Sequence, residues 1–326
     1  MARTAAGDVP PPLWVRAGWR LLNRLRQLSK YPLGFVAFMV VGLYMCLALF
    51  GGMIAPYAYD AIQEDPTQCI ARANGQTRCS ALQNAPPSAQ YPFGTDRNGR
   101  DVFSRVLHGA RYTIGLPLVA TALAVSLGAL LGLAIGYVGG WVDELVSRVF
   151  DSLLSIPALV LALVALSTIV PSLQAWDNPL VMSVGAVNVA LVVVIVLLYT
   201  PIVARVVRSA TLGLRGRGYV ELARLRGEST LYILTSEIFP AVVPTLAVET
   251  SLRFSYAIFL VTSLGFLGLG AQPPLPEWGR MVLDARATAS TAPHALWFPI
   301  LAIATLIISV NVFADALQRS WRTEEG

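Results

Sequence analysis

The chain has 326 residues, of which 55% are hydrophobic and 13% are charged, and its formal net charge is +5. Soluble domains carry roughly 25% charged residues, so a chain this apolar is expected in a bilayer. Its basic excess is arginine with a single lysine, Lys30, and shows no groove pattern with interleaved aromatic residues. These charges therefore predict membrane anchoring and exclude nucleic acid as a partner.

Lys30 also excludes a P-loop in this chain. A P-loop ends in Gly-Lys-Ser or Gly-Lys-Thr, because its lysine reaches the nucleotide phosphates. Lys30 instead follows Leu28 and Ser29 and precedes Tyr31. We expect this chain to bind no cofactor, and any ATP that drives its function to be hydrolysed by another chain.

The N-terminal tail, residues 1–32, precedes the first apolar stretch. Within it, residues 14–30 place apolar side chains on one helical face and an arginine ladder on another. This pattern predicts a helix in the membrane interface, with an ordinary juxtamembrane segment as the alternative. The apolar stretch 33–55 starts too far from Met1 and is too long for a cleaved signal peptide.

Six apolar stretches approach the ~20 residues that cross a bilayer. They cover residues 33–55, 113–138, 152–170, 180–204, 241–265 and 296–316. The sequence thus predicts an all-α membrane protein with a first span, an external loop at 56–112, a core at 113–316 and a tail at 317–326. Basic residues gather before the first span and between spans four and five, which predicts both termini in the cytoplasm by the positive-inside rule.

The loop 56–112 contains two of the three cysteines, Cys69 and Cys79. On an oxidising surface two unpaired thiols are disfavoured, so a disulfide between them is expected. Further along, Asp96, Arg97, Arg100 and Asp101 surround two glycines. This pattern predicts a hydrogen-bonded turn that caps the outer face of the bundle.

Two features of the spans concern packing and charge. In the second span, small residues repeat every fourth position at Gly128, Gly132, Gly136 and Gly140, which predicts close approach of another helix. In the fifth span, Glu249 and Arg253 are four residues apart near the membrane centre. The pair either lines a translocation pathway or forms a structural ion pair at a subunit interface.

The segment 219–244 is too polar to cross the membrane, yet its apolar residues follow helical spacing. Gly227 in its middle predicts a sharp turn between two short helices, and Pro240 marks entry to the next span. Two short helices on a cytoplasmic loop suit docking to a partner protein.

This segment resembles the EAA loop of permease subunits in ABC importers. The matching residues are Glu221, Ala223, Gly227, Ile238 and Pro240. Leu222 replaces the second alanine of the motif and Phe239 replaces the leucine before the proline. The resemblance implies that residues 219–240 form coupling helices that dock on an ATPase.

Three further segments, 93–111, 136–157 and 263–286, are similar to permeases of the dipeptide/oligopeptide/nickel group, and the first points to the "C"-type subunit. The resemblance implies a type I importer fold in the inner membrane. It also implies a heterodimer with a second permease, two ATPase subunits that bind ATP and Mg²⁺, an extracytoplasmic binding protein and a peptide substrate.

Other transport functions also fit the sequence. Related systems carry nickel or oligosaccharides, and an ion-coupled secondary transporter would also use charges such as Glu249 and Arg253. An intramembrane enzyme is disfavoured, because the two histidines, His108 and His294, belong to no HExxH pattern and no cysteine pair has zinc-ligand spacing. No metal site is expected.

Overall fold

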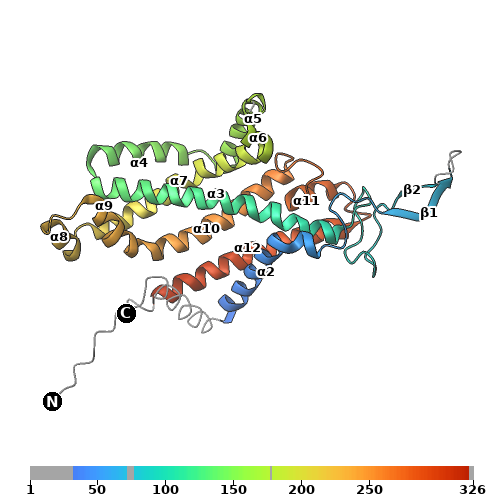
Figure 1. The fold of residues 1–326 in the computed structure, drawn as a ribbon, viewed down its shortest axis with the longest axis horizontal. Coiled ribbons are helices and arrows are strands. Elements are labelled where there is room, and N and C mark those ends of the chain that lie inside the picture. The colour runs from blue at the N-terminus through green and yellow to red at the C-terminus, as the bar shows by residue number, and fades with distance from the viewer. Residues whose placement is uncertain (1–31, 72–76, 177, 323–326) are drawn as a thin grey trace, which may run out of the picture.

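The computed structural model describes residues 32–71, 77–176 and 178–322 of an elongated helical bundle (Figure 1). The predicted interfacial helix at 14–30 lies outside the described residues. A two-stranded hairpin projects from one end of the bundle and two short helices form the other end (Figure 1). The all-α fold class is confirmed, with this hairpin as an element that the sequence analysis did not predict.

Five stretches in the described part of the chain are long and apolar enough to cross a membrane. They are α2 (Pro32–Ile54), α3 (Val102–Val138), α7 (Ala186–Leu214), the helical stretch that ends with α10 (Phe239–Phe266), and α12 (Pro293–Arg322). The short helix α6 (Pro179–Val184) precedes α7, and α11 (Trp278–Arg286) lies between α10 and α12.

The predicted span at 152–170 is not one straight helix. Helix α4 (Gly140–Leu154) ends at Leu154, and α5 (Ala158–Ala175) begins after Pro157 at an angle of 89° to it. Proline has no N–H to donate and disfavours helical geometry at the residue before it, which accounts for the break. The described part of the chain therefore has six candidate spans only when α4 and α5 together count as one.

Helices α3 and α7 approach each other along the glycine stripe. A Cβ added at Gly128 would lie 2.6 Å from the Val203 Cβ, and one added at Gly132 would lie 2.5 Å from the Ala204 carbonyl oxygen. At Gly136 the Arg208 carbonyl oxygen would be 2.9 Å away. Gly140 does not continue the stripe, because α3 ends at Val138 and the chain turns there with positive φ at Gly139 and Gly140.

The hairpin consists of β1 (Glu64–Ala71) and β2 (Thr77–Ala81), which pair antiparallel. The Gln63 N–H joins its base to the 93–111 segment by donating to the Gly99 carbonyl at 2.7 Å, and the Leu82 N–H closes the base by donating to the Gln63 carbonyl at 2.8 Å. The hairpin is thus an extension of the same end of the bundle that carries α11 (Figure 1).

Candidate functional site

The tip loop (residues 219–240) lies at the end of the bundle opposite the hairpin (Figure 1). It comprises most of α8 (Gly218–Leu225), then α9 (Thr230–Tyr232) and the π-helix η1 (Ile233–Ile238), which runs directly into α10. Gly227 turns the chain between α8 and α9 with φ of 77°, and a Cβ added there would meet nothing within 4 Å. Backbone conformation, not lack of space, therefore favours glycine at this position.

One face of the tip loop is buried against the bundle. Val220, Ala223, Ile233 and Ile238 form a single apolar cluster with residues of α3, α7 and α10. Two motif residues that are far apart in sequence, Ala223 and Ile238, therefore meet in one packed core. Pro240 lies in the first turn of α10 and is exposed.

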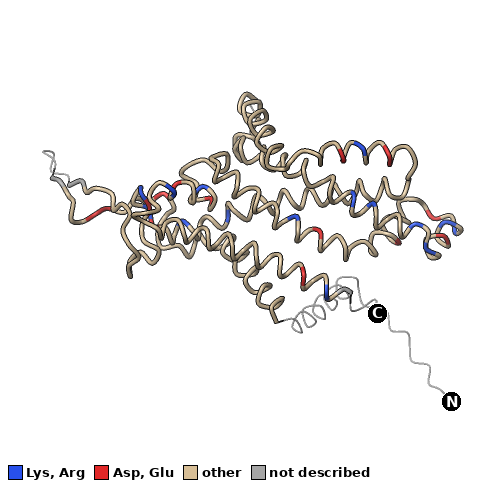
Figure 2. Tube along the Cα trace, turned by 180° about the vertical axis from the view of Figure 1, so that it is seen from behind, with Lys and Arg blue, Asp and Glu red and all other residues tan. Residues whose placement is uncertain are grey.

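The other face exposes a set of large apolar side chains, the leucine patch, which consists of Tyr219, Leu222, Leu225, Leu231 and Tyr232. Leu222 is 62% exposed and Leu225 is 84% exposed. Charged residues surround the patch, so this end of the bundle does not lie in hydrocarbon (Figure 2). Exposed apolar patches rimmed by polar residues are typical of protein–protein or membrane interaction sites.

Glu221 points away from the buried face and makes no ion pair with any described residue. It lies on α8 beside the exposed Leu222, so its carboxylate is available to a partner. The structure thus separates the motif residues by role: Ala223 and Ile238 pack inward, Gly227 turns the chain, and Glu221 faces outward.

Two contacts that the sequence analysis missed brace the tip loop. Arg224 Nε donates to the Tyr137 hydroxyl at 3.2 Å, and its guanidinium lies 4.9 Å from the centroid of that ring. Arg226 pairs with Glu237 at 3.7 Å across the turn. The first contact joins residues 87 apart, and no local spacing signals such a pair.

Glu249 and Arg253 form an ion pair one helical turn apart in α10, with 2.8 Å between the Glu249 Oε1 and Arg253 Nε atoms. The Arg253 guanidinium lies 4.9 Å from the Tyr256 ring centroid and 5.8 Å from the ring of Tyr199 in α7. The structure therefore places the predicted pair in an aromatic setting between two spanning helices.

At the hairpin end, the 93–111 segment forms the hydrogen-bonded turn that the sequence predicts. Asp96 accepts from the backbone N–H groups of Asn98 and Arg100 and pairs with the Arg100 guanidinium at 2.8 Å. Arg97 and Arg100 lie 3.6 Å and 4.0 Å from Asp284 of α11. This network joins the start of α3 to α11.

Glu277 caps the N-terminus of α11 from a fully buried position. Its carboxylate accepts from the Gly279 N–H at 2.7 Å and from the Arg280 N–H at 2.8 Å. Burial raises the pKa of this carboxyl to about 7, although both backbone hydrogen bonds act in the opposite direction. Glu277 carries no strong capping signal in the sequence, because the residues preferred at a helix N-cap are Ser, Thr, Asp, Asn and Gly.

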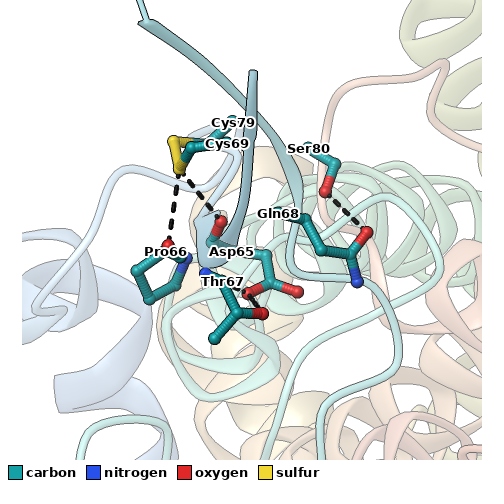
Figure 3. The surroundings of a disulfide bond; sticks show 7 residues. All are labelled: Asp65, Pro66, Thr67, Gln68, Cys69, Cys79 and Ser80. Carbon is teal, nitrogen blue, oxygen red and sulfur yellow. Dashed lines mark hydrogen bonds between the residues drawn. A yellow bond between two sulfur atoms is a disulfide. The ribbon is translucent and has the colours of Figure 1, made fainter. Parts of the chain in front are cut away.

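In the hairpin, the sulfurs of Cys69 and Cys79 are joined in a disulfide, with 3.9 Å between the Cα atoms (Figure 3). The two residues face each other across β1 and β2. Nearby, the Thr67 hydroxyl and the Thr67 N–H donate to Asp65 at 2.6 Å and 2.9 Å and lower the pKa of that carboxyl, and the Ser80 hydroxyl donates to Gln68 at 3.0 Å. The third cysteine, Cys46, is a free thiol in α2.

Residues 116–323 match the family model described as "Binding-protein-dependent transport system inner membrane component". The chain is 33% identical over 318 residues to the dipeptide transport system permease protein DppC of Alkalihalophilus pseudofirmus, covering 97% of this chain and 94% of that protein. It is 35% identical over 319 residues to the glutathione transport system permease protein GsiD of Escherichia coli, with 97% and 95% covered.

Among solved structures, the chain resembles the inward-facing MetNI methionine ABC transporter. The TM-score is 0.53 at 18% sequence identity, and the match covers 66% of this chain and 95% of that chain. At this identity the likeness concerns the fold, which is that of a type I importer permease.

Proposed function

The chain belongs to the family of inner membrane components of binding-protein-dependent transport systems, and from this premise we propose that it forms one half of the translocation pathway of an ATP-driven peptide importer. In this proposal the chain binds no cofactor. ATP and Mg²⁺ are held by two partner ATPases, and an extracytoplasmic binding protein delivers the substrate.

The leucine patch is the observation that carries the proposed docking on an ATPase. Large apolar side chains at a charged, membrane-distal tip gain free energy only when a partner covers them. The buried face of the same loop is packed against α3 and α7, so a push on the patch is passed to the spanning helices. Glu221 beside the patch offers a carboxylate with which a basic side chain of the partner can pair.

The tip loop faces the cytoplasm in this proposal, together with both termini. The arginines between spans four and five support this orientation by the positive-inside rule. The disulfide at the opposite end supports it as well, because disulfides persist in oxidising compartments outside the cytoplasm.

A second, homologous permease completes the pathway in this proposal. The surface of α10 supports a protein neighbour on that side, since Tyr256 and Phe259 are 51% and 61% exposed next to the charged Arg253. A charged side chain beside lipid is costly, whereas one beside protein or a water-filled path is tolerated.

The experiment is affinity purification of the tagged chain in mild detergent, with native mass spectrometry of the complex. The expected complex contains one copy of this chain, one second permease and two P-loop ATPases. A Leu222→Asp, Leu225→Asp variant should lose the ATPases and keep the second permease. Ile62→Asp is the matched control, because Ile62 is also an exposed apolar residue but lies at the hairpin end.

Peptides are the proposed substrates, since the matched relatives are named for dipeptide and glutathione transport. ATP-dependent uptake into proteoliposomes should be strongest for peptides, with Ni²⁺ and oligosaccharides as the competing cargoes to be tested. A chain that purifies alone and transports under an ion gradient would contradict the importer proposal and support a secondary transporter.

A further inference from the structure

The Glu249–Arg253 pair has hydrogen-bonding capacity that the described residues leave unused. The Glu249 Oε1 and Arg253 Nε atoms are 2.8 Å apart, yet neither atom has a hydrogen-bond partner among the described residues. A guanidinium carries five N–H donors, and the buried Nε–H of Arg253 is one that the described residues leave without an acceptor. The contact is electrostatic and leaves the planar donor edge of Arg253 available.

The surroundings of Arg253 favour an anionic ligand. The Arg253 and Glu249 side chains are 14% and 11% exposed, so water screens them only partly. The rings of Tyr199 and Tyr256 lie beside the guanidinium and hold it without neutralising its charge. A carboxylate matches the guanidinium edge with two parallel hydrogen bonds, which are stronger than those between neutral groups.

Arg253 is also reachable from the outer surface of α10. Residues 249, 253 and 256 follow each other at helical spacing, and Tyr256 at the end of this row is half exposed. A lipid-facing position for this row is disfavoured by the cost of its charges. The row therefore faces protein or a water-filled path.

Resting on the proposed function, we propose that Arg253 binds the terminal carboxylate of a peptide in transit, and that Glu249, released from Arg253, binds the peptide ammonium group. The empty site is neutral because the two side chains neutralise each other. A zwitterionic peptide replaces both halves of the pair and leaves the site neutral again, so no net charge enters the membrane at any stage. A peptide without its carboxylate cannot make this exchange.

The test is ATP-driven uptake by the complete reconstituted importer with its binding protein, using one dipeptide as the free acid and as the C-terminal amide. The uptake ratio of acid to amide is measured for the wild type and for Arg253→Gln. The binding protein contributes the same selectivity to both complexes, so the change in the ratio reports the permease alone. We expect the ratio to fall by roughly tenfold or more in Arg253→Gln, since the variant loses the charge-assisted hydrogen bonds to the carboxylate.

Arg148→Gln is the matched control, because Arg148 pairs with Glu144 at the same spacing, 2.5 Å apart, on the exposed surface of α4. Its acid-to-amide ratio should equal that of the wild type. If Arg253→Gln folds poorly, the double variant Glu249→Gln, Arg253→Gln leaves no unpaired charge and should show the same fall. Glu249→Gln alone should keep the acid preference and lose the preference for a free amine over an N-acetylated peptide.

Uptake that falls by the same factor for acid and amide would overturn the inference, since a purely structural ion pair does not distinguish the two peptides. An unchanged ratio in Arg253→Gln would overturn it as well, while leaving the peptide importer intact. Failure of the proposed function has a different signature, because the wild-type complex would then take up neither peptide.

Discussion

The two ends of the bundle depend on different kinds of residue. At the tip, Gly227 supplies a backbone conformation, whereas at the hairpin end buried side chains lock α11 to α3. The Trp278 N–H donates to the Thr113 hydroxyl, and the Trp278 ring N–H donates to the Val106 carbonyl, both at 3.0 Å. Beside them, a Cβ added at Gly265 would collide with the Glu277 carboxylate, so this glycine provides the space for the cap.

Glu277→Gln should change how stability depends on pH. The pKa of Glu277 in the folded protein, about 7, lies above its ordinary value of 4.5, so folding favours the protonated carboxyl. The contribution of Glu277 to the free energy of unfolding is fully present below the pKa of the unfolded state and is lost as pH rises through the pKa of the folded state. Glutamine resembles the protonated form and does not titrate. The thermal midpoint of the variant relative to the wild type, measured in detergent, should therefore rise between about pH 5 and about pH 7.

A constant offset between the two midpoints across this pH interval would show that Glu277 does not titrate there. The comparison cancels the other carboxylates, which are the same in both proteins.

Gly132→Ala and Gly115→Ala should have opposite effects on stability, although both residues lie in α3. The added methyl group at Gly132 would lie 2.5 Å from a backbone oxygen of α7, whereas at Gly115 it would meet nothing within 4 Å. Overpacking typically costs about 1–3 kcal/mol, and relief of glycine in an open helical site stabilises by about 0.5–1 kcal/mol. Thermal unfolding in detergent checks both signs. Equal shifts would contradict the close approach of α3 and α7.

At the scale of elements, hydropathy predicted helices well where apolar runs are continuous. The predicted spans 33–55 and 296–316 correspond closely to α2 (Pro32–Ile54) and α12 (Pro293–Arg322). Hydropathy failed at Pro157, where an apolar stretch that predicts one straight span bends by 89°. It also missed the hairpin, because β1 contains a proline and charged residues and lacks the apolar alternation of a half-buried strand. The disulfide and the backbone hydrogen bonds of Gln63 with Gly99 and Leu82 hold the hairpin together in place of a buried apolar face.

The turn between α8 and α9 should tolerate asparagine better than alanine at Gly227. A left-handed conformation costs an ordinary residue roughly 1–2 kcal/mol, and asparagine adopts it more readily than alanine does. We expect Gly227→Ala to lower ATP-driven uptake and Gly227→Asn to lower it less. Gly218→Ala is the matched control, because Gly218 has open space and no positive φ. An effect of equal size at both glycines would contradict a conformational role for Gly227.

At the scale of the whole molecule, charges gather at the two ends and the apolar middle carries few (Figure 2). The motif residues of the tip loop were predicted from sequence because they lie within one short segment. The brace between Tyr137 and Arg224 and the aromatic setting of Arg253 beside Tyr199 were not, since only the packing of α3, α7 and α10 brings these residues together. Local patterns thus predicted the candidate site residues, while the partners of these residues depend on helix packing.

The hairpin end should lie in an oxidising compartment, and a thiol count tests this orientation. The chain has three cysteines, of which Cys46 is free and Cys69 and Cys79 are joined. Protein that is taken from the membrane and denatured without reductant should react with one equivalent of maleimide, and with three after reduction, as measured by intact mass. Three equivalents without reductant would place the hairpin on a reducing side.

The glycine stripe has a mechanical consequence. The backbones of α3 and α7 are in close contact at Gly132 and Gly136, so sliding or rotation of one helix against the other would cause a steric clash. We therefore expect the two helices to move as one rigid unit. Any rearrangement during a transport cycle must then be absorbed elsewhere along the chain. The π-helical turn η1 before α10 and the break between α4 and α5 are departures from regular α-helix outside this pair, and we expect a rearrangement to fall there.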